Sequence, residues 1–264
     1  MNRPIYYLTN SRWIWFFKGL PSFPRARALF LVRRYTMTSP ERCRSLWDSC
    51  KLVLGQNVPG CFVECGVWKG GSSGLMALAI NDAGQKRHLH MFDSFEGLPD
   101  PTEKDGKQAV AWYSTRSGPV VREPAGKNEK RVSASNRKGE EEKIHEVQQC
   151  RADMEGVRHL ILDKIKMPEE LTHFHVGWFQ STLPADAGQL GPIALLRLDG
   201  DWYDSTKICL EHLYPLLSPG GVIILDDYYS FEGCQKATDE YRNLHQIECP
   251  ICRIDGDAVY WLKK

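Results

Sequence analysis

The chain has 264 residues, of which 42% are hydrophobic, so it is long enough to bury one full-sized core. Its 34 lysines and arginines balance 33 aspartates and glutamates, which leaves a formal net charge of +1. This balance excludes a general electrostatic attraction to nucleic acids or to an anionic membrane surface. Recognition by charge must therefore be local.

Residues 1–38 form a tail ahead of the predicted domain. The segment MNRPIYYLTNSRWIWFFKGLPSF has an aromatic patch, but it lacks both an apolar run of the ~20 residues that a membrane span needs and a small-residue cleavage site. We expect no membrane association and a tail that packs on the body or on a partner subunit of a homo-oligomer.

The nine cysteines are an odd number and are scattered along the chain. Cys61 and Cys65 lie inside an apolar, strand-like run, which predicts reduced, buried thiols and a cytoplasmic location rather than a disulfide framework. Cys249 and Cys252 form one C-x-x-C, but no second pair stands at zinc spacing, so a redox or metal role is disfavoured.

Strands and helices are expected to alternate along the chain. The first helix begins after Ser39, a candidate N-cap followed by Pro40, and a helix after the first strand stops at Gly84. Strands are predicted within 60–66, 88–93, 171–179, 192–200 and 220–227, and helices within 39–56, 72–84, 205–217 and 231–244. This order predicts a three-layer α/β fold with a mostly parallel sheet covered on both faces.

Two segments interrupt the alternation. Residues 251–255 and 257–263 are separated by little more than Gly256, which fits a hairpin and predicts one antiparallel C-terminal strand at the edge of the sheet. Residues 103–145 are charged and poor in apolar anchors, so we expect a mobile polar insertion within a domain that spans 39–264.

Carboxylates gather where the predicted strands end. Asp93 ends the second strand, Asp199 and Asp201 follow the fourth, and Asp226 and Asp227 follow the fifth. Since ligands of open α/β sheets bind outside the carboxyl ends of the strands, these side chains are expected in one cleft.

A glycine-rich turn follows the first strand in VECGVWKGGSS. Its glycines allow a ligand close to the backbone, although the turn is neither G-x-G-x-x-G nor a phosphate loop. Asp93 lies about twenty residues further on, where nucleoside-binding sheets place the carboxylate that accepts ribose hydroxyls. Tight turns and close helix packing would also explain the glycines; Asp93 favours a nucleoside ligand.

Helix capping explains Asp204, and it could explain Asp227. It does not explain Asp199 and Asp226 together, because unpaired carboxylates at neighbouring strand ends repel and raise each other's pKa. A hard divalent cation such as Mg²⁺, which binds carboxylates, waters and substrate oxygens, would remove the repulsion.

Five long segments resemble the TylF or macrocin O-methyltransferase family. They are FVECGVWKGGSS (62–73), MFDSFEGLPDPTEKDG (91–106), GWFQSTLP (177–184), LDGDWYDST (198–206) and LYPLLSPGGVIILDDYYSFEGCQKATDEYR (213–242). The resemblance runs from about Tyr35 to the C-terminus and implies a Rossmann-like class I methyltransferase fold. It also implies S-adenosylmethionine (SAM) and Mg²⁺ as cofactors, and a sugar hydroxyl of a glycosylated natural product as the acceptor.

The resemblance further implies individual roles. Asp199, Asp226 and Asp227 would bind the metal, Asp199 would also be the general base, and residues 35–39 would form a lid. The cofactor-binding residues implied are Thr36, Met37, Glu64, Gly66, Val67, Gly70, Gly71, Ser72, Asp93, Ser94 and Asp199. We expect a hydroxyl coordinated to Mg²⁺ to lose its proton to Asp199 as its oxygen attacks the sulfonium methyl.

The aromatic side chains of Trp178, Trp202, Tyr228, Tyr229 and Phe231 are expected near the strand ends, where they could pack on an acceptor ring. A catechol would chelate the ion as two sugar hydroxyls do and is the main alternative acceptor. A non-catalytic SAM-binding protein is a further alternative. A haloacid-dehalogenase-type phosphatase fits poorly, because its D-x-D motif follows the first strand, whereas DGD here follows the fourth.

Overall fold

The computed structural model describes residues 23–117 and 150–264, so residues 1–22 and most of the expected insertion lie outside the described part. The helices are α2 (Phe23–Val32), α3 (Pro40–Gly55), α4 (Gly71–Ala83), α5 (Gly106–Ser117), α7 (Met154–Arg158), α8 (Phe179–Asp186), α9 (Tyr203–Leu213) and α10 (Glu232–Leu244). Single-turn and irregular helices are η2 (Glu103–Asp105), the π-helix η3 (His159–Lys164), η4 (Glu169–Leu171), η5 (Ala187–Gln189) and η6 (Tyr214–Leu216).

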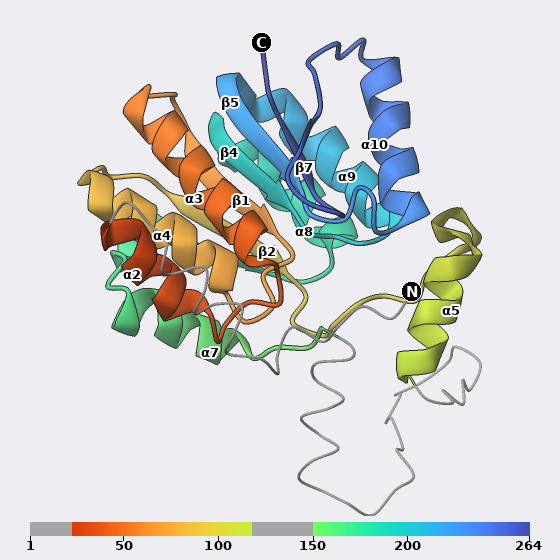
Figure 1. Cartoon of the computed structure of the whole chain (residues 1–264), viewed down its shortest axis with the longest axis horizontal. Coiled ribbons are helices and arrows are strands. Elements are labelled where there is room, and N and C mark those ends of the chain that lie inside the picture. The colour runs from red at the N-terminus through yellow and green to blue at the C-terminus, as the bar shows by residue number, and fades with distance from the viewer. Residues whose placement is uncertain (1–22, 118–149) are drawn as a thin grey trace, which may run out of the picture.

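The strands form one sheet in the order β3-β2-β1-β4-β5-β7-β6. Figure 1 labels β1, β2, β4, β5 and β7 of this sheet. They are β1 (Cys61–Cys65), β2 (Leu89–Asp93), β3 (Thr172–Val176), β4 (Ile193–Leu198), β5 (Leu217–Leu225), β6 (Cys252–Arg253) and β7 (Val259–Leu262). Strands β1 to β5 pair in parallel and β7 pairs antiparallel with β5. The predicted mostly parallel sheet with an antiparallel C-terminal strand is confirmed.

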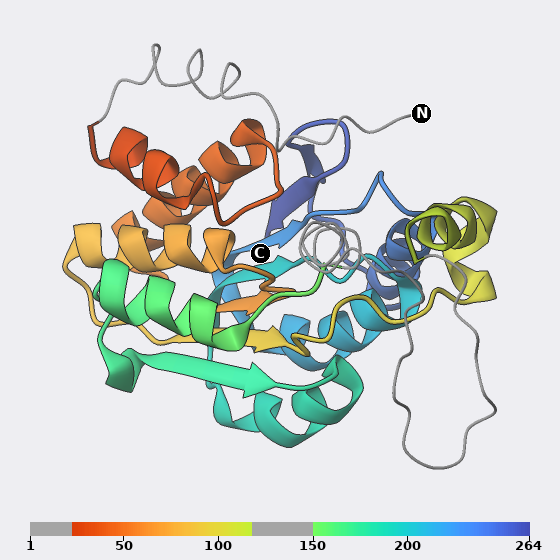
Figure 2. The same ribbon diagram turned by 90° about the horizontal axis from the view of Figure 1, so that it is seen from below.

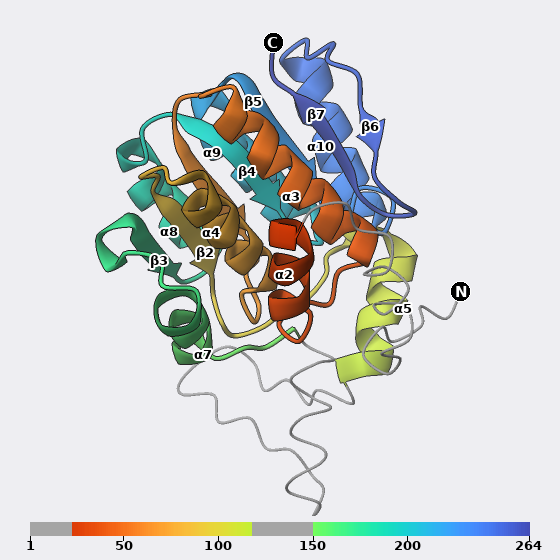
Figure 3. The same cartoon turned by 60° about the vertical axis from the view of Figure 1, so that its left-hand side comes forward.

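The edge of the sheet differs from the prediction in one respect. The antiparallel strand β7 is internal, and the short β6 pairs with its outer side and forms the edge (Figure 3). In a hairpin the two strands pair with each other, so only one of them can also pair with β5. The expectation that the antiparallel strand itself is the edge was therefore wrong.

Helices cover both faces of the sheet, as predicted (Figure 2). One apolar cluster joins α2, α3, α4 and α7 to the first face and includes Phe62 of β1. The other joins α8, α9 and α10 to the second face and includes Val63 of the same strand. Successive side chains of a strand point to opposite faces, so both faces of β1 are buried, and the strand is apolar except for Glu64.

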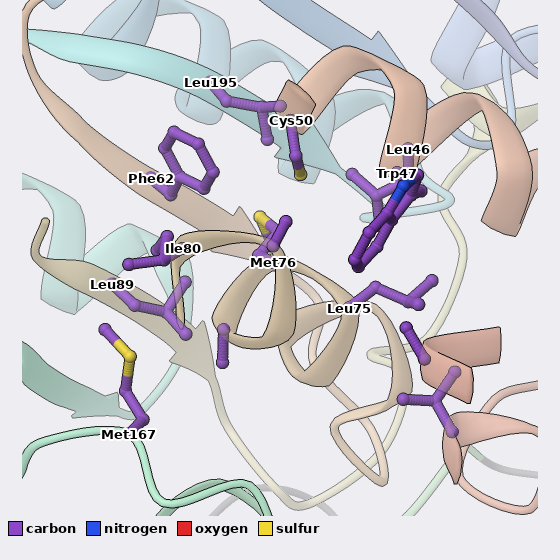
Figure 4. Close-up of a cluster of buried hydrophobic side chains, with 14 of the residues drawn as sticks. Leu46, Trp47, Cys50, Phe62, Leu75, Met76, Ile80, Leu89, Met167 and Leu195 are labelled. Carbon is purple, nitrogen blue, oxygen red and sulfur yellow. The ribbon is translucent and has the colours of Figure 1, made fainter. Parts of the chain in front are cut away.

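Helix α3 illustrates how local signals produce this core. The Ser39 hydroxyl accepts the N–H of Arg42 (3.1 Å) at the helix start, as expected of an N-cap. Leu46, Trp47 and Cys50 recur on one face and are buried against the sheet (Figure 4). The predicted helix end at Gly84 is also confirmed for α4.

The first part of the expected insertion is helical. Residues 103–105 form η2, residues 106–117 form α5, and 118–149 lie outside the described residues. The buried Asp105 explains the anchoring, because it accepts the backbone N–H groups of Thr102 (2.6 Å) and of Tyr203 (2.6 Å) at the start of α9. The predicted mobility of the insertion stays a prediction, although its first part is helical and anchored to the domain.

Other boundaries shift by a few residues. Strand β3 ends at Val176 rather than Phe179, because Gly177 has a φ of 143° and α8 begins two residues later. The predicted helix 205–217 starts earlier, at Tyr203, and is replaced by η6 after Leu213.

All nine cysteines lie in the described residues and are free thiols, seven of them buried, as predicted. Among the described helices, none has both the length and the apolar character required to cross a bilayer.

Candidate active site

A cavity lies at the carboxyl ends of β1, β2, β4 and β5, where the sequence predicted a cleft. It is also lined by the segment between α2 and α3 and by the residues that follow β3. Eleven of the thirteen predicted site residues line it, namely Thr36, Met37, Gly66, Val67, Gly71, Ser72, Asp93, Ser94, Asp199, Asp226 and Asp227.

Glu64 and Gly70 are the two predicted residues outside the lining. Glu64 is fully buried in β1, where its carboxylate accepts hydrogen bonds from the Ser73 hydroxyl and from Arg197 Nη1 (2.7 Å). Gly70 is the N-cap of α4 and has a φ of 82°, and a Cβ there would lie 2.8 Å from Val157 Cγ1. The structure thus places both behind the cavity wall, and their predicted cofactor contacts stay predictions.

The glycine turn after β1 is required by close packing of the chain itself. Gly66 has a φ of 87°, and a Cβ at this position would lie 2.0 Å from the carbonyl oxygen of Asp199. This approach brings the backbone of Asp199, whose N–H donates to Cys65 O (2.9 Å), against the end of β1. Gly66 therefore helps to position a predicted catalytic residue.

Asp93 braces the same turn. Its Oδ2 accepts the N–H groups of Val67 (2.7 Å) and Trp68 (2.9 Å), and its Oδ1 accepts that of Phe95 (2.6 Å). Burial raises the pKa of Asp93, and these three hydrogen bonds oppose the rise. An ionised carboxylate has about four acceptor positions, so one remains for a ligand in the cavity.

Residues 35–38 are tied to the start of α4. The N–H of Gly71 donates to Tyr35 O (3.0 Å), and a Cβ on Gly71 would lie 2.6 Å from both that oxygen and Thr36 Cβ. Lys164 Nζ in turn donates to the Tyr35 hydroxyl (2.5 Å). The segment therefore lines the cavity, and its role as a lid stays a prediction.

The three aspartates predicted to bind a metal lie together, with carboxylate oxygens within 4.8 Å of one another. Asp226 has protein cations on both oxygens: Arg197 Nη2 donates to Oδ1 (2.7 Å) and Arg42 Nη1 to Oδ2 (2.6 Å). Although burial opposes ionisation, these two guanidinium groups lower the pKa of Asp226. Part of the compensating positive charge is therefore the protein's own.

The negative charges of Asp199 and Asp227 are less well compensated by protein cations than that of Asp226. Asp227 Oδ2 is buried and has no hydrogen-bond partner among the described residues. Burial and the carboxylates of Asp201 and Asp199 raise the pKa of Asp227 well above its usual range. Burial, followed by the carboxylate of Asp226, likewise raises the pKa of Asp199. A buried acceptor without a donor and two carboxyl groups of raised pKa fit a divalent cation with oxygen ligands.

The sequence prediction missed the two arginines. Arg197 is buried in β4 and bonds Glu64, Asp226 and Asp199 Oδ2 (3.0 Å), all with the same guanidinium group. A charged residue inside the apolar run IALLRL was a usable signal, because arginine is almost never fully buried without a partner. No comparable signal existed for Arg42, which lies on an ordinary amphipathic helix.

The expected aromatic platform is only partly present. Trp178 lines the cavity, whereas Trp202 packs edge-on against Phe231 and donates its indole N–H to Pro99 O (2.8 Å). Tyr228 is buried and donates to Asp239 (2.7 Å), and Tyr229 is exposed. Of the five aromatic residues, the structure places only Trp178 on the cavity wall.

The sequence model of the family described as macrocin-O-methyltransferase (TylF) matches residues 31–121 and 127–263. A tetracenomycin-C 4'-O-methyltransferase of Streptomyces olivaceus, whose full name specifies an 8-demethyl-8-(2,3-dimethoxy-alpha-L-rhamnosyl) substrate, is 35% identical over 86% of this chain and 75% of its own length. Demethyldecarbamoylnovobiocin O-methyltransferase of Streptomyces niveus is 33% identical over 86% of this chain and 75% of its own length.

Solved structures agree with the sequence matches. The O-methyltransferase NovP superposes with a TM-score of 0.66 at 31% identity, covering 87% of this chain and 82% of its own. The calicheamicin methyltransferase CalS11 superposes with a TM-score of 0.63 over 99% of this chain and 94% of its own, and at 19% identity it shows the shared fold alone.

Proposed function

As a member of the macrocin-O-methyltransferase (TylF) family, this chain is a methyltransferase, and we propose that it transfers the methyl group of SAM to a sugar hydroxyl of a glycosylated natural product with the help of Mg²⁺. One observation carries the proposal. The under-compensated pair Asp199 and Asp227 lines the same cavity as the glycine turn and Asp93.

The cofactor would occupy the part of the cavity between the glycine turn and residues 35–38. Asp93 retains an acceptor position for a ribose hydroxyl, and Gly66, Val67 and Ser72 offer backbone close to the ligand. When bound there, SAM would supply an electrophilic sulfonium methyl group. The bond from Gly71 to Tyr35 would keep the covering segment in place and reduce access of water.

The cation would be held by Asp199 and Asp227, with Asp226 beside them. When bound, Mg²⁺ would supply Lewis acidity that lowers the pKa of an acceptor hydroxyl. Arg197 and Arg42 would keep Asp226 ionised and fixed, so that the other two carboxylates remain available.

Asp199 is the best-placed general base. Its side chain is 32% exposed, against 7% for Asp226, and Arg197 Nη1 holds one of its oxygens at 3.0 Å. The Asp199 carboxylate would accept the proton of the acceptor hydroxyl, while the methyl group would pass from the sulfur of bound SAM to the hydroxyl oxygen and S-adenosylhomocysteine would leave. Orientation of the hydroxyl by the cavity would contribute much of the rate.

A product assay with isotopically labelled SAM tests this function. Glycosides with intact vicinal hydroxyls, the same glycosides lacking one of them, and catechols are offered side by side. We expect methylation of the intact glycosides, loss of activity after chelation and recovery with Mg²⁺. Asp199→Asn should lower turnover by at least about 100-fold, whereas Asp204→Asn, an exposed position on α9, should leave it unchanged.

Methylation of catechols alone would refute the sugar assignment. Full activity after exhaustive chelation would refute the role of the cation without refuting methyl transfer. The proposed enzyme is cytoplasmic and homo-oligomeric, and light scattering on the purified chain tests the assembly.

A further inference from the structure

A second cluster of ligand-type side chains lies at the opposite end of β2 and β3 from the cavity. His88 directly precedes β2, His90 lies within it, and the parallel register places His90 opposite His173 of β3. The rings of His90 and His173 stack with centroids 4.3 Å apart, and His88 Nδ1 lies 2.8 Å from His173 Nε2. Side chains at alternate positions share one face, so the histidines form a ladder across the two strands.

A carboxylate on α8 fixes the hydrogen positions in this ladder. Asp186 Oδ2 lies 2.7 Å from His175 Nδ1, and because an ionised carboxylate only accepts, His175 carries its hydrogen on Nδ1. In the neutral ring, His175 Nε2 then accepts the hydrogen of His90 Nδ1, 3.1 Å away. The other nitrogen of His90, Nε2, is left with a free lone pair.

The surroundings of His90 and His173 favour the neutral form of these two rings. Burial and then the neighbouring imidazoles of His173, His175 and His88 lower the pKa of His90 to about 3. Burial and the adjacent histidines also lower the pKa of His173. Neutral imidazole is the form that binds metal ions, and a histidine whose other ring N–H reaches a carboxylate or a second acceptor is typical of metal sites.

We propose that His88, His90 and His173 bind one divalent transition-metal ion of the zinc class, at a site separate from the aspartate cluster. One nitrogen from each residue already lies within 4.8 Å of the other two. Tetrahedral coordination with bonds of 2.0–2.1 Å places ligands about 3.3 Å apart, so the rings must close by small side-chain rotations. The exposed His88 provides the entrance and leaves a fourth position for water.

The chemistry of the ligands separates this site from the proposed Mg²⁺ site. Mg²⁺ takes oxygen ligands, whereas zinc-class ions accept imidazole nitrogen. An ion here would clamp the edge strand β3 to β2 (Figure 3). Strand β3 leads directly into Gly177 and Trp178 of the cavity wall, so an ion that holds β3 against β2 would also restrict the movement of that wall.

Calorimetric titration of the metal-stripped full chain with Zn²⁺, in excess Mg²⁺, tests the proposal. We expect each chain to bind one Zn²⁺ ion with high affinity. His88→Gln and His173→Asn should each weaken it by at least about tenfold, and Asp186→Asn, which disturbs the hydrogen-bond relay, should weaken it by about 10–100-fold. His159→Gln, an exposed histidine on η3, and Asp227→Asn are the matched controls and should bind Zn²⁺ as the parent does.

The spectrum of the Co²⁺-substituted protein distinguishes histidine from cysteine ligation, and circular dichroism establishes that each variant is folded. A Co²⁺ spectrum that indicates nitrogen ligands and lacks a thiolate-to-cobalt charge-transfer band supports the proposed histidine site. Absence of Zn²⁺ binding, binding that follows Asp227 rather than His88, or affinity unchanged in His88→Gln and His173→Asn would each overturn it.

Discussion

Arg197 connects three acidic residues at the centre of the candidate site. It is 3% exposed, and its guanidinium group contacts Glu64, Asp199 and Asp226. Removing one partner of a buried ion pair leaves the charge of the other partner buried without compensation. The resulting loss of folding free energy is far larger than the net stabilisation that the intact pair provides. The arrangement makes the positions of two site aspartates depend on one side chain of β4.

Arg197→Met should therefore lower the free energy of unfolding by about 3–5 kcal/mol. Urea denaturation of the chelator-treated protein measures the loss. Arg27→Met, at an exposed position of α2, is the control and should change stability by no more than about 0.5 kcal/mol. A loss below about 1 kcal/mol for Arg197→Met would show that the acidic residues do not depend on this cation.

Glu64 predicts a specific pH dependence. Burial raises its pKa to about 7, against the lowering effects of Arg197 and Ser73. Since the folded-state pKa exceeds the unfolded value of about 4.3, the folded protein binds more protons between these values, and its stability falls as the pH rises from about 4 to 7. Relative to Glu64→Gln, the parent should lose at most about 1.4 kcal/mol per pH unit in this window.

Denaturation of both proteins at several pH values measures the difference. Glu41→Gln, at an exposed position of α3, serves as the reference variant. A parent-to-Glu64→Gln difference that stays constant between pH 5 and 7 would contradict the assignment.

Among individual residues, the sequence predicted the site aspartates better than the arginines that pair with them. Asp93, Asp199, Asp226 and Asp227 follow apolar runs, and strand ends converge in a parallel sheet, so their meeting could be expected. Arg42 contacts Asp226 across 184 residues, and no local pattern encodes that distance. The expected repulsion between unpaired carboxylates therefore does not apply to Asp226, which has two guanidinium partners, and a metal bound by these aspartates stays a prediction.

Among the elements, α4 and the segment before α3 depend on a single small residue. Gly71 starts α4 and lies so close to Tyr35 and Thr36 that a Cβ would meet both at 2.6 Å. A backbone oxygen cannot move away as the tip of a flexible side chain can. Any larger residue must displace residues 35–38 from the cavity.

Gly71→Ala should thus weaken binding of S-adenosylhomocysteine by at least about tenfold, which corresponds to about 1.4 kcal/mol. Calorimetry measures the affinity and thermal unfolding monitors the fold. Gly55→Ala, at a helical position with no atom within 4 Å of the added Cβ, should leave binding unchanged and stabilise the protein by about 0.4–1 kcal/mol. Equal affinities of the two variants would show that residues 35–38 do not contribute to the cofactor site.

Elements with strong local patterns were predictable, and those that rely on distant contacts were not. The periodicity and cap of α3 and the apolar runs of β1, β4 and β5 were sufficient. Helix α5 lies in a polar segment and follows η2, whose Asp105 bonds the start of α9. The position of α5 therefore depends on the tertiary contact between Asp105 and α9, which cannot be predicted from amino-acid composition.

Over the whole molecule, α3 and the C-terminal hairpin are joined beside the site. Arg42 Nε donates to Asp255 Oδ2 (2.8 Å), and the same guanidinium group bonds Asp257 and Asp226. Burial opposes ionisation of Asp255, but the backbone N–H groups of Asp257 and Ala258, and then Arg42, lower its pKa to about 2. The hairpin thus supplies charge to the site as well as strands to the sheet.

A double-mutant cycle of Arg42→Met and Asp255→Asn should give a coupling energy of about 1 kcal/mol or more, because the pair is partly buried and charged on both sides. Chemical denaturation of the four proteins measures it. The control cycle replaces Asp255→Asn with Asp82→Asn, which removes the more exposed ion pair with Lys51. The stability changes of Asp82→Asn and Arg42→Met should be additive. Additivity in the first cycle would show that the hairpin is held by its strands alone.

The contact between Arg42 and Asp255 also has a consequence for the order in which the protein matures. Its two partners are 213 residues apart, so a ribosome must add almost the entire domain before Arg42 meets its acidic neighbours. The nascent chain consequently completes its sheet and the set of acidic partners of Arg42 in the same step, as the final hairpin closes.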